Sequence, residues 1–327
     1  ATNRNTAGAA DAGEDRFGNG RMEKLSYGYF DVRVEPSLGL GMLVNPTQWL
    51  QNEEIQLDAV SDLDRAGLID ALRAQVERSP YQSLLVVVHG YRESFPTALR
   101  KTAFLGHILD LDTPVLVFDW PGDQGRTLSG YRRARTVAEA SGTELAEVLR
   151  LAIEEIAPQR LWLLANSMGA QVAAEAFAPL MAVDALADAA AEFENVIFTA
   201  PDVDQAEFDD RFEAEIMALA RQLTVYVSSN DRALLLSRIV NRSPRQGESG
   251  LSPDQLSEAL QISNLVKPGH SRVALVDVTP VNRTRNFHNF SLETPEFFDD
   301  LYLRLTNRDA PASRVIYPFQ TAGGEVY

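Results

Sequence analysis

Six short apolar runs, separated by segments with helical periodicity, constrain the fold more than any other feature of the sequence. They cover residues 84–88, 115–118, 161–165, 196–200, 223–228 and 273–278. Runs of this length and apolar character are typical of strands that are covered on both faces, as in a parallel sheet. Their alternation with helical segments predicts an α/β fold with a doubly wound, mostly parallel sheet.

The segment before the first run has a different pattern. Apolar and polar residues alternate over residues 30–35 and again over 55–59, which predicts two half-buried strands in an antiparallel arrangement. Residues 64–78 have helical periodicity, and Pro80 ends the segment. The first residues, rich in Gly, Asn and Ala, contain almost no apolar anchors, so we expect residues 1–24 to form a flexible arm.

The remainder of the chain is expected to form one domain over residues 25–306, with a C-terminal extension at 307–327 packed on it. Two connections, 121–140 and 241–271, are longer than a strand-to-helix link requires and are candidates for lids or for plain surface loops. The fourth and fifth apolar runs lie too close together for a large cap domain between them.

One helix has a clear predicted beginning. Ser141 and Glu144 have the spacing of a capping box, and the apolar residues that follow them trace one helical face as far as Pro158. We therefore expect a helix that begins near Ser141.

Composition and charge narrow the classes of partner. The chain carries 46 acidic and 30 basic residues, a formal charge of -16, and a field of that sign repels nucleic-acid phosphates and anionic lipids. The sequence contains no cysteine, which excludes disulfides, thiolate nucleophiles and cysteine-ligated metals. Metal-binding and phosphate-binding motifs are absent, so we expect no metal, no cofactor and no nucleic-acid partner.

The sequence carries little information on localisation. It contains no run of about 18 apolar residues, so we expect no transmembrane helix. The first residues do not show the basic-then-apolar pattern of a signal peptide, which favours the cytoplasm weakly and leaves open a secreted form whose signal has been removed.

Residues 161–170 carry the sharpest chemical signal. An apolar strand runs through Ser167 into small residues that begin a helix, the pattern of a nucleophile elbow with Ala165 in place of the first glycine of G-x-S-x-G. The alternative is a serine that merely caps a helix, an interpretation to which Gln171 gives some support. The small residues on both sides of Ser167 favour the nucleophile.

A serine nucleophile needs a base, and the chain has four histidines: His89, His107, His270 and His288. Active sites in open parallel sheets lie beyond the carboxyl ends of the strands. His270 precedes the last apolar run and is at the wrong end, while His107 falls inside a helical segment. His288 follows the last run and is the predicted base, with an ordinary loop histidine as the alternative.

The acid of such a triad is expected after the penultimate strand. Asp231 follows the run at 223–228 and gives the chain order Ser167, Asp231, His288. Asp202, which follows the run at 196–200, is the competing candidate. Asp231 could also serve only as a helix cap.

The exit of the first apolar run is the expected position of half an oxyanion hole. We expect the main-chain amides of Tyr91 and Met168 to face the developing negative charge, with Gly90 permitting the close approach. His89, Asn166 and Trp120 are candidates for contact with substrate, although a structural hydrogen bond suits His89 better than proton transfer does.

Five motifs in this order resemble those of one bacterial family. They are His89-Gly90-Tyr91, Phe118-Asp119-Trp120-Pro121, Ala165-Asn166-Ser167-Met168-Gly169, Ala200-Pro201-Asp202-Val203-Asp204 and Ser229-Asn230-Asp231-Arg232-Ala233-Leu234. The family is a branch of the α/β-hydrolases catalogued as a domain of unknown function, and the resemblance covers residues 25–305. It implies the α/β-hydrolase fold and a triad of Ser167, Asp231 and His288, without an established substrate. Members usually carry His where this chain has Asn166, a difference at the floor of the pocket.

The residues and the resemblance together predict a serine hydrolase that cleaves carboxylic esters through an acyl-enzyme on Ser167. The expected partner is a small ester or acyl compound. The same triad would also serve a thioesterase, an amidase or an acyltransferase. The alternative from another class is a non-catalytic scaffold that binds its partner in the same cleft.

Overall fold

The centre of the molecule is a six-stranded parallel sheet in the order β5-β4-β6-β7-β8-β9. The computed structural model describes residues 1–7, 16–34, 55–183, 192–204, 207–228, 272–282, 289–306, 319–321 and 324–326. The strands are β4 (Ser83–Val88), β5 (Val115–Phe118), β6 (Arg160–Asn166), β7 (Asn195–Thr199), β8 (Leu223–Val227) and β9 (Val273–Asp277). Each predicted apolar run is thus confirmed as a strand of one parallel sheet.

The order of the strands reverses beside β4. The chain passes from β4 to the edge strand β5 and then returns across β4 to β6, which pairs with β4 from Ser83↔Arg160 to Val88↔Ala165. Ligands of open α/β sheets bind where the order reverses, beyond the carboxyl ends of the strands. In this fold that position is the end of β4 and of β6, where His89 and Ser167 begin the two loops.

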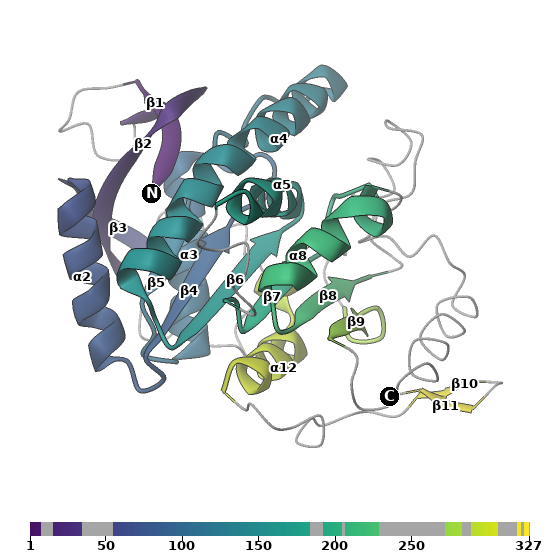
Figure 1. Ribbon diagram of the computed structural model, residues 1–327. Helices are drawn as coiled ribbons and strands as arrows, with labels where there is room; N and C mark the ends of the chain where they lie inside the picture. Colours follow the sequence, from purple (N-terminus) through teal and green to yellow (C-terminus); the bar gives the residue numbers. More distant parts are fainter. Residues whose placement is uncertain are drawn as a thin grey trace.

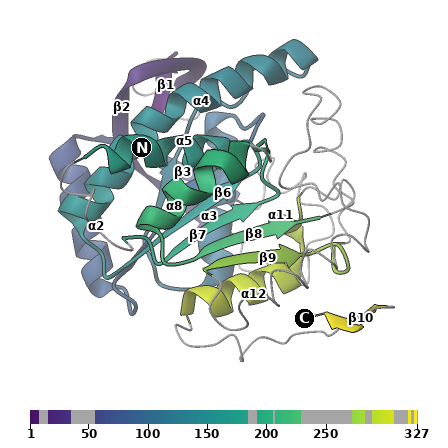
Figure 2. The same cartoon turned by 45° about the vertical axis from the view of Figure 1, so that its right-hand side comes forward.

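Helices cover both faces of the sheet (Figure 1). They are α2 (Arg65–Arg78), α3 (Phe95–Leu109), α4 (Leu128–Leu151), α5 (Gly169–Met181), α8 (Glu213–Leu219) and α12 (Pro295–Thr306). Because side chains alternate along a strand, Leu84, Val86 and Val88 enter one core with α4, α5 and α8, while Leu85 and Val87 enter a second core with α3 and α12. Figure 2 shows α8 and α12 on opposite sides of the strands.

The predicted helix over residues 64–78 is confirmed as α2, which begins after Asp64. The carboxylate of Asp64 accepts a hydrogen bond of 2.7 Å from the amide of Gly67, a standard N-cap. Leu68, Ile69, Leu72 and Val76 are buried on the face predicted from their spacing.

The N-terminal part forms a separate three-stranded antiparallel sheet, β1-β2-β3, at the opposite end of the molecule from β9 and α12 (Figure 1). Its strands are β1 (Thr2–Thr6), β2 (Phe17–Val34) and β3 (Ile55–Leu63), and β2 pairs with β3 from Tyr27↔Leu63 to Val34↔Ile55. This confirms the predicted antiparallel pair.

The expectation of a flexible arm over residues 1–24 does not agree with these strands. Thr2, Asn3 and Arg4 are buried, and Thr2 forms a parallel bridge with Asp119 at the end of β5. The prediction rested on the shortage of apolar residues, but polar side chains hold this segment through hydrogen bonds and ion pairs with residues far along the chain.

The helix expected to begin near Ser141 begins earlier, at Leu128, with the hydroxyl of Thr127 accepting from the Gly130 amide at 3.1 Å. Ser141 and Glu144 lie in the middle of α4, where the side-chain amide of Asn3 donates to both at 3.0 Å. These two side chains therefore anchor β1 and do not cap a helix. Residues 128–140 of the predicted lid belong to α4, and residues 241–271 lie outside the described residues.

The connection from β7 to β8 contains the π-helical turn Phe208–Phe212 and α8, within the described residues. This agrees with the absence of a large cap at that point. Near the C-terminus, β10 (Phe319–Thr321) pairs antiparallel with β11 (Gly324–Val326). Among the helices described, none is both long enough and apolar enough to cross a membrane.

Candidate active site

Ser167 lies in a sharp corner between β6 and α5. It is 6% exposed, and its φ of 52° places it in the left-handed region that non-glycine residues rarely adopt. The corner is held by neighbouring main chain: the Ser167 amide donates to the Thr199 carbonyl at 2.9 Å, and the Ser167 carbonyl accepts from the Asp202 amide at 3.1 Å. A strained serine at a strand-to-helix corner is the geometry of a nucleophile elbow.

Two glycines allow the loop after β4 to approach this corner. A Cβ on Gly169 would lie 2.4 Å from the carbonyl oxygen of His89 and 2.7 Å from that of Val88. A Cβ on Gly90 would lie 3.0 Å from Cβ of Ser167. These distances leave no room for a side chain at Gly169, so the corner at Ser167 depends on glycine there.

Tyr91 follows Gly90 in the loop after β4, and Met168 follows Ser167 in the elbow. Within the described part of the chain, neither N–H donates to another protein group, although Met168 is completely buried. Buried amides are nearly always paired, so the unpaired amide of the buried Met168, next to a strained serine, suits an acceptor that arrives with a ligand. The role of the Tyr91 and Met168 amides as oxyanion donors stays a prediction.

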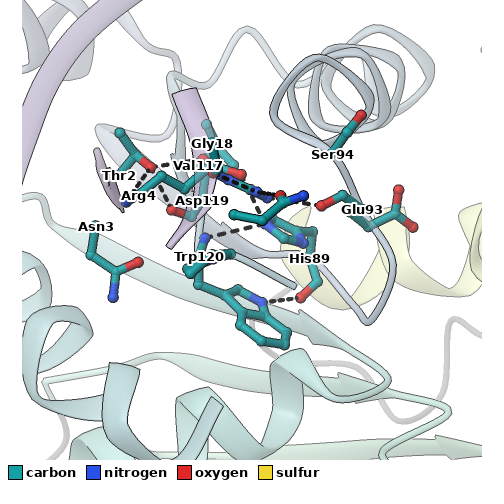
Figure 3. A network of polar contacts seen from close by, with 12 residues as sticks. Thr2, Asn3, Arg4, Gly18, His89, Glu93, Ser94, Val117, Asp119 and Trp120 are labelled. Atoms are coloured by element: carbon teal, nitrogen blue, oxygen red, sulfur yellow. Dashed lines mark hydrogen bonds and ion pairs between the residues drawn. The ribbon is translucent and has the colours of Figure 1, made fainter. Parts of the chain in front are cut away.

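A buried polar network lies beneath the loop after β4 (Figure 3). The ring of His89 contacts Asp119 Oδ1 through Nε2 and the Gly90 carbonyl oxygen through Nδ1, each at 3.0 Å. Arg4 Nε donates to Asp119 Oδ2 at 2.7 Å, and the side chains of Arg4 and Asp119 are 0% and 1% exposed. The Thr2 hydroxyl also donates to Asp119 Oδ2, at 2.7 Å, so the donors to this carboxylate come from distant parts of the chain.

His89 and Trp120 are held by contacts within the protein, and their contact with substrate stays a prediction. Trp120 is 0% exposed, its ring stacks on that of His89 at 5.7 Å, and its indole N–H donates to the His89 carbonyl at 2.8 Å. Both ring nitrogens of His89 have protein partners, as expected of a structural histidine. The Trp120 indole holds the carbonyl of the His89–Gly90 peptide, so these side chains fix the main chain just before Gly90.

The charge of Asp119 is set by its partners. Burial alone would raise the pKa of its carboxyl, but the Arg4 guanidinium and the hydrogen bond from His89 outweigh burial and lower this pKa from the ordinary 3.8 to about 2. Asp119 is therefore ionised in the folded protein across the neutral and mildly acidic range.

This shift predicts a specific loss of stability in acid. Because folding lowers the pKa, ionised Asp119 stabilises the fold above about pH 4, and this contribution, about 2 kcal/mol, is lost as the pH falls from about 4 to about 2. The variant Asp119→Asn has no carboxyl to protonate, so it cannot lose this contribution. The free energy of unfolding in urea, measured at several pH values from 5 downward, should fall more steeply for the wild type than for Asp119→Asn. Parallel profiles would contradict the assignment of this charge to Asp119.

Asn166, the candidate at the pocket floor, lies at the end of β6 beside Ser167. Its side-chain amide donates to Thr199 Oγ1 at 2.9 Å and to Ser291 Oγ at 3.2 Å. It also lines a small cavity of about 40 Å³ together with Gly90, Ser291 and Leu292. The side chain thus ties the elbow to β7 and to the short helix α11 (Phe290–Glu293), and contact with substrate stays a prediction.

Asp202, the alternative acid, is close to the elbow through its main chain. Its carboxylate is buried and accepts a hydrogen bond of 2.8 Å from the hydroxyl of Tyr131, on α4. The ring of Tyr131 packs edge-on against Tyr91 at 5.6 Å. Asp202 therefore links α4, the loop after β4 and the Ser167 carbonyl.

Asp231 and His288 lie outside the described residues, as does His270, and their roles stay predictions. The segment that contains Asp231 follows β8 after one described residue, and the segment that contains His288 follows β9 after residues 278–282. Both strands are parallel to β6 in the same sheet, so their carboxyl ends lie at the edge where Ser167 lies. No group of three or more His, Cys, Asp or Glu side chains gathers in a metal-binding arrangement among the described residues.

Thr199, Tyr131 and Arg4 were not predicted as site residues. A threonine at the end of a strand and a tyrosine near the start of a helix are common, and only the sheet order brings both to Ser167. Arg4 is separated from Asp119 by most of the N-terminal half of the chain. Only the position of Thr199, at the carboxyl end of a predicted strand, could have marked one of these three residues as part of the site.

The solved structures that resemble the chain have low sequence identity to it and low TM-scores. Solved structures similar to the chain include an uncharacterized protein from Bacillus cereus, with 15% identity over 67% of this chain and 60% of that chain and a TM-score of 0.37. An α/β serine hydrolase without lid from Xanthomonas campestris has 16% identity over 71% and 84%, with a TM-score of 0.34. A thermophilic esterase from Thermogutta terrifontis has 13% identity over 71% and 84%, with a TM-score of 0.36. At these identities and TM-scores, no statement about substrate follows.

The comparison with curated proteins gives no match. The family model described as alpha/beta hydrolase of unknown function (DUF900) matches residues 65–298, which include β4, Ser167 and the loops around it. The family resemblance predicted from the five motifs is confirmed, and the chain belongs to this family of α/β-hydrolases of unknown function.

Proposed function

We propose that the protein is a serine hydrolase that cleaves carboxylic esters through an acyl-enzyme on Ser167. The observation that carries the proposal is the position of Ser167: a serine at φ 52°, at the end of a central parallel strand, against the loop after β4, where a Cβ on Gly90 would lie 3.0 Å from the Ser167 Cβ. A capping serine has no need of a strained backbone.

In the first half of the reaction, His288 takes the proton from the Ser167 hydroxyl as the serine oxygen attacks the ester carbonyl carbon. The carbonyl oxygen becomes an oxyanion that accepts hydrogen bonds from the Tyr91 and Met168 amides. The C–O bond to the alcohol then breaks, His288 returns the proton to the departing oxygen, and an acyl ester of Ser167 remains.

In the second half, His288 takes a proton from water, and the resulting hydroxide attacks the acyl carbon. The same amides stabilise the second oxyanion. The bond to the Ser167 oxygen breaks, the serine recovers its proton from His288, and the carboxylic acid leaves. Asp231 holds the His288 ring and stabilises its protonated form between the two transfers.

Single amide substitutions distinguish the two candidate acids. Asp231→Asn is expected to lower kcat by about 10³-fold or more, because an amide cannot stabilise the protonated histidine. Asp202→Asn keeps the main-chain bond to the Ser167 carbonyl and is expected to lower kcat by about tenfold or less. Steady-state kinetics of the two variants, with their melting temperatures as controls for folding, gives the comparison. A larger loss in Asp202→Asn than in Asp231→Asn would assign the acid to Asp202.

A panel of nitrophenyl esters from acetate to palmitate tests the proposed reaction and finds the preferred acyl length. The wild type should hydrolyse at least one member in a His288-dependent way, so that His288→Gln is inactive on the same ester. A folded wild type that hydrolyses none of these esters would contradict the ester hydrolase. Binding of acyl compounds without turnover would favour the scaffold instead.

A further inference from the structure

Arg4 is a fully buried arginine at the N-terminal edge of the molecule, and all of its contacts are made inside the protein. Its Nη2 donates to the Glu93 carbonyl at 2.8 Å and its Nε to Asp119 Oδ2 at 2.7 Å. Its Nη1 donates to Asn19 Oδ1 at 2.8 Å, on β2. One planar guanidinium thus joins three segments that are distant in the sequence.

Two of these contacts hold the loop of residues 89–93, which we call the oxyanion loop. At its beginning, Asp119 contacts the ring of His89, whose other nitrogen contacts the Gly90 carbonyl. At its end, Arg4 binds the Glu93 carbonyl directly. Arg4 therefore holds the Glu93 end of the segment that carries the Tyr91 amide directly and the His89 end through Asp119 (Figure 3).

The oxyanion loop has a conformation that needs support. Arg92 has a φ of 66°, in the left-handed region, and its amide donates to the Gly122 carbonyl at 3.0 Å. A Cβ on Gly122 would lie 2.8 Å from the Gly90 carbonyl oxygen, so the loops after β4 and β5 are in close contact. Strained backbone of this kind persists only when surrounding contacts determine it.

Anchoring of the N-terminal sheet does not by itself account for these contacts. That sheet has other attachments: Arg21 pairs with Glu144 at 2.6 Å, and Asn3 donates to Ser141 and Glu144 on α4. A buried ion pair is also a weak source of stability, because desolvation of the two charges opposes their attraction. The Arg4–Asp119 pair fixes the direction of the His89 ring and of the Glu93 carbonyl. An apolar pair in the same place would fix neither.

We infer that Arg4, on β1, is a positioning residue for the reaction: through Asp119 and Glu93 it fixes the oxyanion loop so that the Tyr91 amide faces the oxyanion. The inference rests on the proposed function for its effect on rate. The holding of the loop is a separate statement that can be measured without activity. Arg4 touches no reacting atom and acts only through the position of the oxyanion loop.

Four variants of the full chain test this role. Arg4→Met removes the donors with a similar side-chain length, and Arg4→Lys keeps the charge but cannot bind Asp119, Asn19 and the Glu93 carbonyl together. Asp119→Asn breaks the same network from its other side. Arg21→Met is the matched control, since it removes an arginine that anchors the same sheet to α4 without touching the oxyanion loop.

Hydrogen exchange of the loop amides is the first measurement. In Arg4→Met, exchange over residues 89–93 should accelerate about tenfold or more, while the elbow and the start of α5, residues 165–172, exchange as in the wild type. Arg21→Met should leave residues 89–93 unchanged. If Arg4→Met does not fold, Arg4→Lys is compared in the same way. Unchanged exchange in the loop, or equal acceleration throughout the chain, would overturn the inference.

Kinetics on the preferred nitrophenyl ester is the second measurement. Arg4→Met should lower kcat by about 10- to 100-fold with little change in KM, because a misplaced oxyanion donor costs transition-state stabilisation and not ground-state binding. Affinity for a trifluoromethyl ketone, which forms an oxyanion on Ser167, should fall by a similar factor. The kcat of Arg4→Lys should lie between those of the wild type and Arg4→Met. The double variant Arg4→Met/Asp119→Asn should be no slower than the slower of the two single variants.

The two measurements separate the possible failures. A wild type without esterase activity defeats the proposed function, whereas the exchange data still decide whether Arg4 holds the loop. An active enzyme in which Arg4→Met and Arg21→Met have equal kcat and equal ketone affinity would show that Arg4 only supports the fold.

Discussion

Replacing Ser167 with alanine is expected to lower kcat for ester hydrolysis by about 10⁴-fold or more. The substitution removes the oxygen that forms the acyl-enzyme, so only attack by water remains, assisted by the oxyanion donors. Hydrolysis of the preferred nitrophenyl ester, followed at high enzyme concentration, measures this residual rate.

The fold should tolerate the change. Alanine at φ 52° is about as strained as serine, and no hydrogen bond of the Ser167 hydroxyl appears among the described contacts. The melting temperature of Ser167→Ala should therefore stay within a few degrees of the wild type. A variant that keeps more than about a hundredth of the wild-type rate would show that Ser167 is not the nucleophile.

The substitution Gly169→Ala is expected to have the largest effect on the fold, with a loss of about 3 kcal/mol or more in the free energy of unfolding. The new methyl group would lie 2.4 Å and 2.7 Å from the carbonyl oxygens of His89 and Val88. Val88 belongs to β4, which pairs on both sides with β5 and β6, so the strand cannot move aside without breaking the sheet. Relief must come from displacement of the elbow, which would also reduce activity.

Gly106→Ala is the matched control for Gly169→Ala. Gly106 lies within α3, and its Cβ would meet only Cγ2 of Val115, at 3.3 Å. Alanine favours the helix by up to about 1 kcal/mol, so this variant should be as stable as the wild type or slightly more stable. Urea denaturation of both variants gives the comparison. Equal stability of Gly169→Ala and the wild type would mean that β4 and the elbow do not pack as closely as described.

The parts of the fold that were predicted correctly are those determined by apolar burial. The strands β4 to β9 are short apolar runs, and α2 places Leu68, Leu72 and Val76 on one buried face. Such patterns record which side chains leave water, and they are visible within a window of a few residues. The elbow at Ser167 was visible for a related reason, because its corner requires small residues at adjacent positions.

The errors occurred where polar residues are buried. Arg4 looks like part of a solvated arm, and Ser141 with Glu144 looks like the start of a helix. Each of these side chains can be buried because a polar partner binds it, and that partner lies more than a hundred residues away in the sequence. The Asn3 bonds to Ser141 and Glu144 are examples. Local pattern carries no information on such pairs, since a polar residue is equally suited to water and to a distant partner.

The same reason explains the predictions for His89 and Trp120. Their places beyond the first two apolar runs are correct, and both lie at the carboxyl end of the sheet. Which way the side chains point depends on Asp119 and on the stacking between the two rings, neither of which follows from spacing. The sequence thus predicted where His89 and Trp120 lie in the sheet, whereas the contacts of their side chains required coordinates.

Labelling with a fluorophosphonate probe, followed by identification of the modified peptide, tests the nucleophile most directly. Such probes react with serine hydroxyls that a neighbouring base activates beside an oxyanion hole. A serine hydrolase of this architecture requires that the folded wild type is labelled on Ser167 alone and that Ser167→Ala is not labelled. Absence of labelling in a folded wild-type sample, or labelling that persists in Ser167→Ala, would contradict the proposed function.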